Sequence, residues 1–320
     1  MPDDPYPTAQ YILWAYRLLL GREPEDPAAV ESFPVTSRLA VVDRFISSLE
    51  FLASGVRNLQ PLHRRYMVEL DNGLRFWLLS GDRYVSPAIA TGEYESIETA
   101  FVRRHVTPGM AVVDAGANLG WFTVHLALLV GAEGRVDAFE PRSDLMDLLV
   151  KTITENRLTN VSTHNFALGS QNAYAQVIWS VQDVNPGGTN LAFSDFVAPG
   201  ITAQPVAVRT LDTCISHRVD FIKIDVEGSE LLVFKGSERI LAKDRPVILV
   251  EINPSNLMRT SGVSAAEFGR FVEQWDYCLY GITAEGRCEK HLSNTDLSAI
   301  QTLINVAMLP KERAEFTALQ

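Results

Sequence analysis

The sequence predicts an α/β fold: a mostly parallel seven-stranded sheet with helices on both faces, preceded by a small helical module and a β-hairpin. From residue 110 onward, short apolar runs alternate with amphipathic helical stretches. The apolar runs are nearly continuous, which is typical of buried parallel strands rather than of half-exposed ones. A glycine turn within VVDAGANLGWF, residues 112–122, lies between the first of these strands and its helix, as in doubly wound folds.

Residues 1–60 are predicted to form a separate helical module. Apolar residues recur at helical spacing in AQYILWAYRLLLG and in SRLAVVDRFISSLEFLAS, and prolines punctuate the loop between them. The segments YRLLLGREPED and FISSLEF resemble a small helical module found beside bacterial glycan-modifying enzymes. A role in substrate recruitment and a plain helical hairpin that caps the core both remain open.

Residues 61–110 are predicted to form a β-hairpin and a lead-in helix. Asp71-Asn72-Gly73 is a tight-turn signal between the apolar runs YMVEL and LRFWLL. Residues 93–105 then have the pattern of a helix that leads into the main domain.

Residues 111–320 are predicted to form the main domain. We expect its parallel strands at 111–114, 135–139, 161–166, 221–226 and 247–252, with two late strands at 277–282 and 303–309 for which an antiparallel direction is open. Helices are expected at 119–130 and 145–156 and from near Ser229 and Ser264. The alternation breaks between residues 174 and 210, and an insertion at that place in the fold usually covers an active site.

The charge balance argues against a nucleic-acid or anionic-membrane partner. The chain has 28 basic and 39 acidic residues, for a net charge of -11, whereas phosphate backbones are held mainly by clustered lysine and arginine. The charge balance by itself indicates no specific partner; we expect a small-molecule or glycan acceptor from the family resemblance described below, and a homo-oligomer is compatible with the sequence.

The location predicted from the sequence is the cytoplasm. Three cysteines are too few for a disulfide framework, and their spacing is not that of a metal site. The N-terminal MPDDPYP is acidic where a signal peptide would be basic. No run approaches the ~20 apolar residues that span a bilayer.

The turn after the first strand predicts a cofactor site. Gly116 permits a sharp turn and a close ligand approach, and Gly120 lets the following helix sit near the strand. A dinucleotide fingerprint has three glycines, whereas the run from Gly116 is G-A-N-L-G, with Asn118 in the middle. Asp114, just before the turn, suits the amino-acid end of S-adenosylmethionine and would repel a pyrophosphate.

Two further strand ends carry candidate cofactor contacts. Glu140 ends the second strand about 20 residues beyond the glycine turn, where an acid binds ribose hydroxyls. The third strand ends in HNFALG, which places Asn165, Phe166 and Ala167 to contact an adenine ring through amide, stacking and backbone interactions. For Phe166, packing at a strand end is a serious rival interpretation.

The segment DFIKIDVEGSE, residues 220–230, brings charge onto an otherwise apolar strand. Alternation predicts Lys223, Asp225 and Glu227 on one face, if the strand persists that far. Buried charges are costly unless paired, so a functional role is favoured. The next strand ends in VEIN, which brings Glu251 and Asn253 to the same sheet edge.

These motifs together resemble the FkbM family of S-adenosylmethionine-dependent methyltransferases. VVDAGANLG, AFEP, NFALG, RTLD, DFIKIDVEGSE and VEIN occur in the family's order, and the approach segment TGEYES, which contains Glu95, is similar as well. The resemblance covers roughly residues 64–282. It implies the class I methyltransferase fold, S-adenosylmethionine as cofactor, Glu95 as a further cofactor contact, and transfer to an oxygen, often of a sugar or polyketide.

For catalysis we expect Asp225 and Glu227 to orient the acceptor and to take its proton. Asp225 is alternatively a contact of the cofactor's methionine end. A divalent metal held by Asp225, Glu251 and Asn253 is a further alternative, ranked below hydrogen-bonded structure. Of the histidines, His164 alone lies beside a predicted site, and a core or surface role is favoured for each.

Two other functions stay open at the level of sequence. An NAD-dependent oxidoreductase would share the sheet and Glu140, but should show a fuller glycine fingerprint. A non-catalytic methyltransferase-like scaffold would keep the fold and lose the acids, whereas this chain retains Asp114, Glu140, Asp225 and Glu227.

Overall fold

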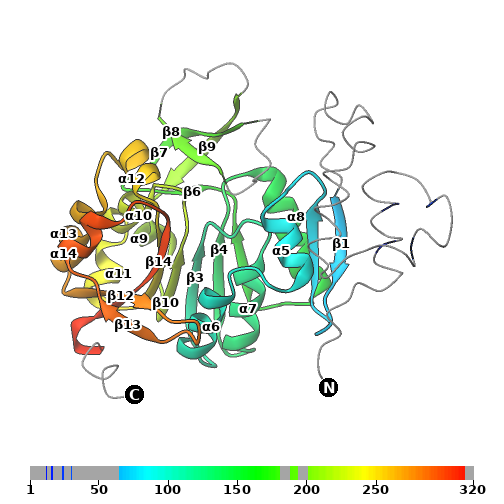
Figure 1. Ribbon diagram of the computed structural model, residues 1–320, viewed down its shortest axis with the longest axis horizontal. Coiled ribbons are helices and arrows are strands. Elements are labelled where there is room, and N and C mark those ends of the chain that lie inside the picture. Colours follow the sequence, from blue (N-terminus) through cyan, green and yellow to red (C-terminus); the bar gives the residue numbers. More distant parts are fainter. Residues whose placement is uncertain are drawn as a thin grey trace. The chain divides into compact units, whose positions relative to one another are not determined.

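The computed structural model describes residues 65–180, 188–193 and 201–313, together with Ile12, Tyr16, Pro24 and Val30. The predicted helical module at residues 1–60 therefore lies outside the described residues, apart from those four. The chain divides into two compact units, residues 1–94 and 95–320. Figure 1 traces the described elements of both units from N- to C-terminus.

The first unit contains the predicted hairpin. Strand β1 (Arg65–Glu69) pairs antiparallel with β2 (Arg75–Leu79), so this prediction is confirmed. Gly73 adopts φ +81° in the turn, which favours glycine at that position. The short helix α5 (Val85–Thr91) follows. The buried carboxylate of Asp82 accepts hydrogen bonds from backbone N–H groups at its start, an acidic cap that the apolar pattern did not indicate.

The second unit contains a large sheet of eight strands. In chain order they are β3 (Ala111–Ala115), β4 (Arg135–Phe139), β5 (Val161–His164), β10 (Phe221–Ile224), β11 (Val247–Ile252), β12 (Tyr277–Ile282), β13 (Cys288–His291) and β14 (Ile304–Pro310).

The spatial order of this sheet is β13-β12-β14-β11-β10-β3-β4-β5. The five strands β11, β10, β3, β4 and β5 pair in parallel, while β14 runs antiparallel to both β11 and β12. The sheet is thus mixed and largely parallel, as predicted, and its two late strands are confirmed. The predicted count of seven is wrong, because the short strand β13 pairs with β12 and adds an eighth at the edge.

Helices separate the strands, as the alternating pattern predicts. They are α6 (Ser96–His105), α7 (Trp121–Val130), α8 (Ser143–Glu155), α9 (Leu211–Cys214), α10 (Glu230–Lys235), α11 (Glu238–Lys243), α12 (Pro254–Ser261), α13 (Ala265–Glu273) and α14 (Asn294–Ala299). Ser264 caps α13 through a complete capping box, which explains why the helix begins where the sequence predicts. Of the helices among the described residues, none is both long and apolar enough to cross a membrane.

The two faces of the large sheet differ in polarity. One face, with α10, α12 and α13, forms an apolar core that includes Ile222 and Val250. On the other face Asp114 and Lys223 are paired neighbours of adjacent strands. Glu251 points to that same face, because Leu249 is the β11 partner of Lys223 and side chains two apart share a face. Three ionisable side chains therefore lie on the face covered by α7.

The break in alternation at residues 174–210 corresponds to a second, four-stranded sheet. Its strands are β6 (Ala167–Leu168), β7 (Ala173–Ser180), β8 (Asn190–Ala192) and β9 (Ile201–Arg209), in the order β6-β9-β7-β8. Figure 1 shows this small sheet at the top of the domain, with α12 beside it. A small apolar core that includes Val177 and Val208 stabilises it.

Candidate functional site

The glycine turn after β3 is held against the end of β10. A Cβ atom built on Gly116, which has φ +87°, would lie 1.8 Å from the backbone oxygen of Asp225. On its other side, the N–H groups of Gly116 and Ala117 both donate to the carbonyl of Phe139, at 2.9 Å. Glycine is therefore required at position 116 by close backbone approach as well as by conformation.

The second glycine of the turn has a different neighbour from the predicted one. Gly120 caps α7 with φ +92°, and a Cβ there would lie 2.7 Å from Leu149 of α8. Close packing of the turn against α8, rather than of α7 against the strand, is thus what glycine allows at this position. The same left-handed residue explains why α7 begins at Trp121, two residues after the predicted start.

Asp114 is fully buried beneath this turn. Its Oδ2 accepts a hydrogen bond of 2.6 Å from the hydroxyl of Thr123 on α7. Its Oδ1 is buried and has no hydrogen-bond partner among the described residues. Burial raises the pKa of Asp114, against the opposing effect of the nearby Lys223 charge. An unused buried acceptor oxygen is costly, and it fits a donor that a ligand would supply.

Glu140 connects the second strand to the glycine turn. Its Oε2 accepts from the backbone N–H of Asn118 and its Oε1 from that of Arg142, both at 2.9 Å. Burial raises the pKa of Glu140 to about 7. Glu140, the residue predicted to bind the ribose, thus contacts the turn predicted to bind the cofactor.

The residues that follow β5 have divided roles. The Asn165 amide donates to the carbonyl of Glu140 at 2.8 Å, so it holds the segment after β4 in place. Phe166 packs edge-on against Phe139, with ring centroids 5.6 Å apart. The strand ends at His164, and Ala167 already belongs to β6 of the small sheet. Contact of residues 165–167 with an adenine ring stays a prediction.

Lys223 forms a buried ion pair with Asp225. Its Nζ lies 2.9 Å from Oδ2 of Asp225 and 4.7 Å from the ring centroid of Phe122. Burial alone lowers the pKa of Lys223, but the charges of Asp225, Glu95 and Asp114 outweigh burial and raise it. The predicted contact Glu95, at the start of α6, is therefore part of the same charged cluster.

Glu227 lies beyond the end of β10, and the structure corrects its predicted placement. The strand ends at Ile224, so alternation does not carry Glu227 onto the Lys223 face. Glu227 instead adopts φ +51°, and three of the six described non-glycine residues with positive φ are Glu95, Asn118 and Glu227. Backbone strain of this kind gathers at functional sites.

The Glu227 carboxylate is partly buried and lies among like charges. Its Oε2 accepts a hydrogen bond of 2.6 Å from the amide of Asn256 on α12. Burial, followed by the charges of Asp225 and Glu230, raises the pKa of Glu227, whereas Arg259 and Lys223 oppose this rise. A carboxyl group with a raised pKa is suited to act as a general base near neutral pH.

Two members of the alternative metal set, Asp225 and Asn253, make other interactions in the structure. Asn253 uses its side-chain oxygen to cap α12, accepting from the N–H groups of Ser255 and Asn256. Burial, followed by the charges of Asp225 and Glu227, raises the pKa of Glu251. No group of three or more His, Cys, Asp or Glu side chains in the described part of the chain is arranged to hold a metal ion.

His164 is tied to the core rather than to the site. Its Nε2 lies 2.9 Å from Oδ1 of Asp137, and its ring stacks on Phe139 at 4.4 Å. This agrees with the structural role that the sequence favours for it.

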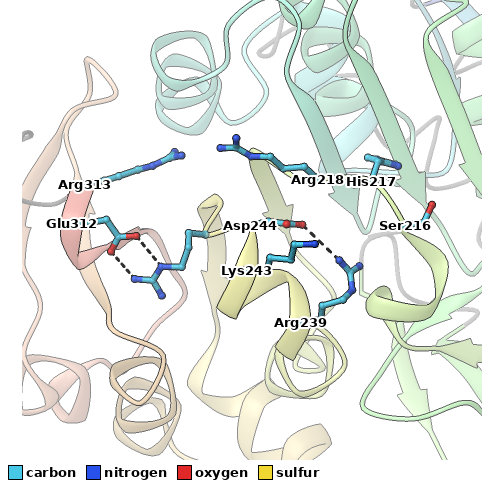
Figure 2. Close-up of a pocket in the computed structure, with 9 residues that line it drawn as sticks. Ser216, His217, Arg218, Arg239, Lys243, Asp244, Glu312 and Arg313 are labelled. Carbon is cyan, nitrogen blue, oxygen red and sulfur yellow. Dashed lines mark hydrogen bonds and ion pairs between the residues drawn. The ribbon is translucent and has the colours of Figure 1, made fainter.

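A charged cavity of about 500 Å³ lies at the opposite edge of the sheet. It is lined by residues that precede β10 and β11, hence at the amino ends of these strands (Figure 2). Its cationic side chains largely form ion pairs with carboxylates: Arg218 lies 3.2 Å from Asp220, and Arg245 lies 2.7 Å from Glu312. We therefore assign this cavity to an ion-pair cluster and place the candidate site at the carboxyl edge, where the ligands of open α/β sheets bind.

The small sheet bridges the carboxyl edge above the candidate site. The guanidinium of Arg142, which follows β4, lies over the Trp179 ring at 4.3 Å and donates to Thr189 at 3.3 Å. On the other side Arg259, in the helix after β11, donates to Asn190 of β8 at 2.5 Å. Strand β8 is thus fixed from both sides of the edge that carries Gly116 and Asp225. This supports the expectation that the insertion covers the site.

Sequence reasoning missed three residues of this site. Glu230 is buried and accepts from the N–H groups of Gly228 and Val226, and Asn256 and Arg259 link Glu227 to β8. Glu230 could have been predicted from the sequence, because it follows the turn residues Gly228 and Ser229 at the start of a helix. Asn256 and Arg259 carry no local signal, because their partners are distant in sequence.

The chain matches known methyltransferases in two kinds of comparison. Residues 114–279 match the family model of the methyltransferase FkbM domain. A stretch of 100 residues is 32% identical to protein-L-isoaspartate O-methyltransferase 2 of Arabidopsis thaliana. That match covers 28% of this chain and 31% of the relative, so the chain spans about a third of the curated protein's length.

Solved structures also align with the chain. A methyltransferase FkbM from Methylobacillus flagellatus aligns at 14% identity over 88% of this chain and 65% of that one, with a TM-score of 0.42. An rRNA methylase, described as putative, from Clostridium thermocellum aligns at 17% identity over 66% of this chain and 92% of that one, also with a TM-score of 0.42.

Replacing Gly116 with alanine should destabilise the fold more than the same change at a glycine with free space. The Cβ would collide with the Asp225 carbonyl, and left-handed strain adds to this, for about 2–4 kcal/mol in the free energy of unfolding. Gly262→Ala is the matched control, since Gly262 has φ +70° and nothing within 4 Å of its Cβ. Urea unfolding measures both; equal losses would contradict the close approach.

Glu230→Gln should flatten the dependence of stability on pH. Burial raises the pKa of Glu230 to about 7, above the value of 4.5 that it has when exposed. An acid whose pKa is higher in the folded than in the unfolded state stabilises the fold at pH values below the unfolded pKa. This contribution is lost as the pH rises through the folded pKa. The variant should therefore unfold like the parent near pH 4.5 and be more stable by about 3 kcal/mol near pH 8. Urea unfolding at both pH values tests this, with the exposed Glu238→Gln as control; equal pH slopes for parent and Glu230→Gln would refute it.

Proposed function

The chain belongs to the FkbM family of S-adenosylmethionine-dependent methyltransferases, and from this premise we propose that it methylates a hydroxyl group of a sugar, glycan or related natural-product precursor. The observation that carries the proposal is the placement of Glu227. This partly buried carboxyl group has a raised pKa and a strained backbone, and it follows the strand end whose Asp225 backbone touches the glycine turn. A neutral alcohol must lose a proton during methylation, and Glu227 is the group suited to take it.

The residues around the glycine turn fit the cofactor. Asp114 and Asn118 each hold a buried side-chain oxygen with no hydrogen-bond partner among the described residues. These oxygens suit the ammonium group of an amino-acid moiety, while Glu140 suits the ribose hydroxyls. S-Adenosylmethionine, when bound, supplies an electrophilic methyl group.

The two acids of the catalytic pair receive different roles. The ion pair with Lys223 holds Asp225 in place, so we assign it to orienting the acceptor or the cofactor's methionine end. Glu227 keeps one oxygen on Asn256 and has the other to accept the acceptor's proton. In-line alignment of an oxygen nucleophile with the methyl group supplies the remainder of the catalysis.

The proposal extends to organisation and location. Residues 111–320 form the cofactor-binding domain, residues 61–110 the hairpin and lead-in helix, and residues 1–60 a helical module. The cytoplasm is the proposed location, and the three cysteines, all free thiols, agree with it.

Calorimetry with S-adenosylhomocysteine and NAD tests the cofactor site. We expect binding of the first and none of the second, because the buried acids beside the turn repel a pyrophosphate. Glu140→Gln should weaken S-adenosylhomocysteine binding by about 1–2 kcal/mol, through loss of charge-assisted hydrogen bonds. Glu133→Ala, an exposed acid at the opposite edge of the sheet, should leave it unchanged. Unchanged affinity of the Glu140 variant would remove this residue from the site.

Single-turnover methylation of a panel of sugars and glycans tests the catalytic assignment. Glu227→Gln should lower the rate on the true acceptor by ~10²–10⁴-fold, while the melting temperature and cofactor affinity change little. Asp225→Asn should weaken cofactor or acceptor binding and also lower stability, because it leaves Lys223 buried without its partner. A fully active Glu227→Gln enzyme would place the base elsewhere. No methylated product from any acceptor, despite cofactor binding, would favour a non-catalytic scaffold.

A further inference from the structure

A continuous chain of hydrogen bonds joins the small sheet to Glu227. The Asn256 amide nitrogen donates to Oε2 of Glu227 at 2.6 Å. The Asn256 oxygen accepts from Nη2 of Arg259 at 2.8 Å. The same nitrogen of Arg259 donates to Oδ1 of Asn190 at 2.5 Å. One guanidinium nitrogen thus serves both β8 and the amide that holds Glu227.

The three segments of this chain of bonds are distant in sequence. Glu227 follows β10, Asn256 and Arg259 lie one turn apart on α12, and Asn190 begins β8. Strand β8 pairs with the rest of the small sheet at three positions only, Gln176 to Ile178 of β7. The hydrogen bond from Arg259 to Asn190, and that from Arg142 to Thr189 just before the strand, therefore contribute much of what locates β8 over the site.

Arg259 affects the ionisation of Glu227 as well as its position, because of the charges that surround Glu227. Asp225, Glu230 and Glu251 lie on the segments around it and repel its negative charge. Among the described residues, the cations that act on Glu227 against these carboxylates are Arg259 and Lys223, and Lys223 is paired with Asp225. Arg259 thus favours the ionised, proton-accepting form of Glu227.

Resting on the role of Glu227 as base, we propose that Arg259 is a positioning residue: it couples the docking of β8 over the acceptor site to the placement and charge of the Glu227 carboxylate. When β8 is docked, Asn190 and Asn256 together hold the guanidinium of Arg259 on the amide that binds Glu227. When β8 is displaced, the guanidinium loses one of its two anchors, and Glu227 holds its proton more tightly. The base is then fully active only beneath a closed cover, which keeps water from the reacting methyl group.

Carbon-13 NMR of the full chain, labelled at the glutamate carboxyl carbon, tests this without any acceptor. The Glu227 resonance is assigned by its loss in Glu227→Gln. Arg259→Gln should raise the Glu227 titration midpoint by up to about 1 pH unit, because it removes a positive charge that opposes protonation of this carboxyl group. Arg259→Lys should keep the Glu227 midpoint close to that of the parent protein, because lysine retains the positive charge. Arg270→Gln, which removes an exposed arginine from α13, is the matched control and should change nothing.

The coupling itself is tested by a double-mutant cycle with Asn190. Asn190→Ala alone should raise the Glu227 midpoint by less than Arg259→Gln does, and should add nothing in the Arg259→Gln background. An unchanged midpoint in Arg259→Gln, or additive shifts in the double variant, would overturn the proposal. If Arg259→Gln fails to fold, Asn190→Ala alone still tests the coupling, because an unchanged Glu227 midpoint in that variant would also overturn the proposal. A coupled cycle beside a fully active Glu227→Gln enzyme would leave the coupling intact and reject Glu227 as the base.

Discussion

The buried ion pair between Lys223 and Asp225 is the interaction on which the carboxyl edge of the large sheet depends. Lys223 is almost fully buried, and carboxyl groups of Asp225, Asp114 and Glu95 raise its pKa. A single buried ammonium offsets only part of this negative charge, so nearby acids such as Glu251 favour their neutral forms. The edge thus combines a shortage of positive charge with raised carboxyl pKa values. A cationic sulfonium cofactor and a proton-accepting base both suit such a place.

Backbone geometry makes this concentration of charge usable. Gly116 lets the turn after β3 touch the carbonyl of Asp225, so that cofactor and catalytic segments share one edge. Glu227 leaves the strand in a left-handed conformation, which directs it away from the Lys223 pair and toward α12. The small sheet then closes over this edge through Arg142 and Arg259. The glycine turn, the proposed base Glu227 and the small sheet are thereby linked by a few short contacts.

The sequence predicts the framework well because the framework is local. Strand β11 begins and ends where the apolar run does, and the spacing of Asp114, Gly116 and Gly120 predicts the turn after the first strand. Alternation failed at Glu227, because the chain departs from strand geometry after Ile224 under the constraint of the Gly116 contact. The eighth strand and the links through Arg259 were not predicted. They depend on pairing between residues far apart in sequence, about which local periodicity says nothing.

A crystal structure with S-adenosylhomocysteine bound would test whether the carboxyl edge holds the cofactor. We expect the homocysteine amino group to lie against Asp114 and Asn118 and the ribose against Glu140, with open space for an acceptor between the sulfur position and Glu227, beneath β8. A ligand bound instead in the charged cavity at the amino edge, lined by Arg218 and Lys243, would contradict this expectation.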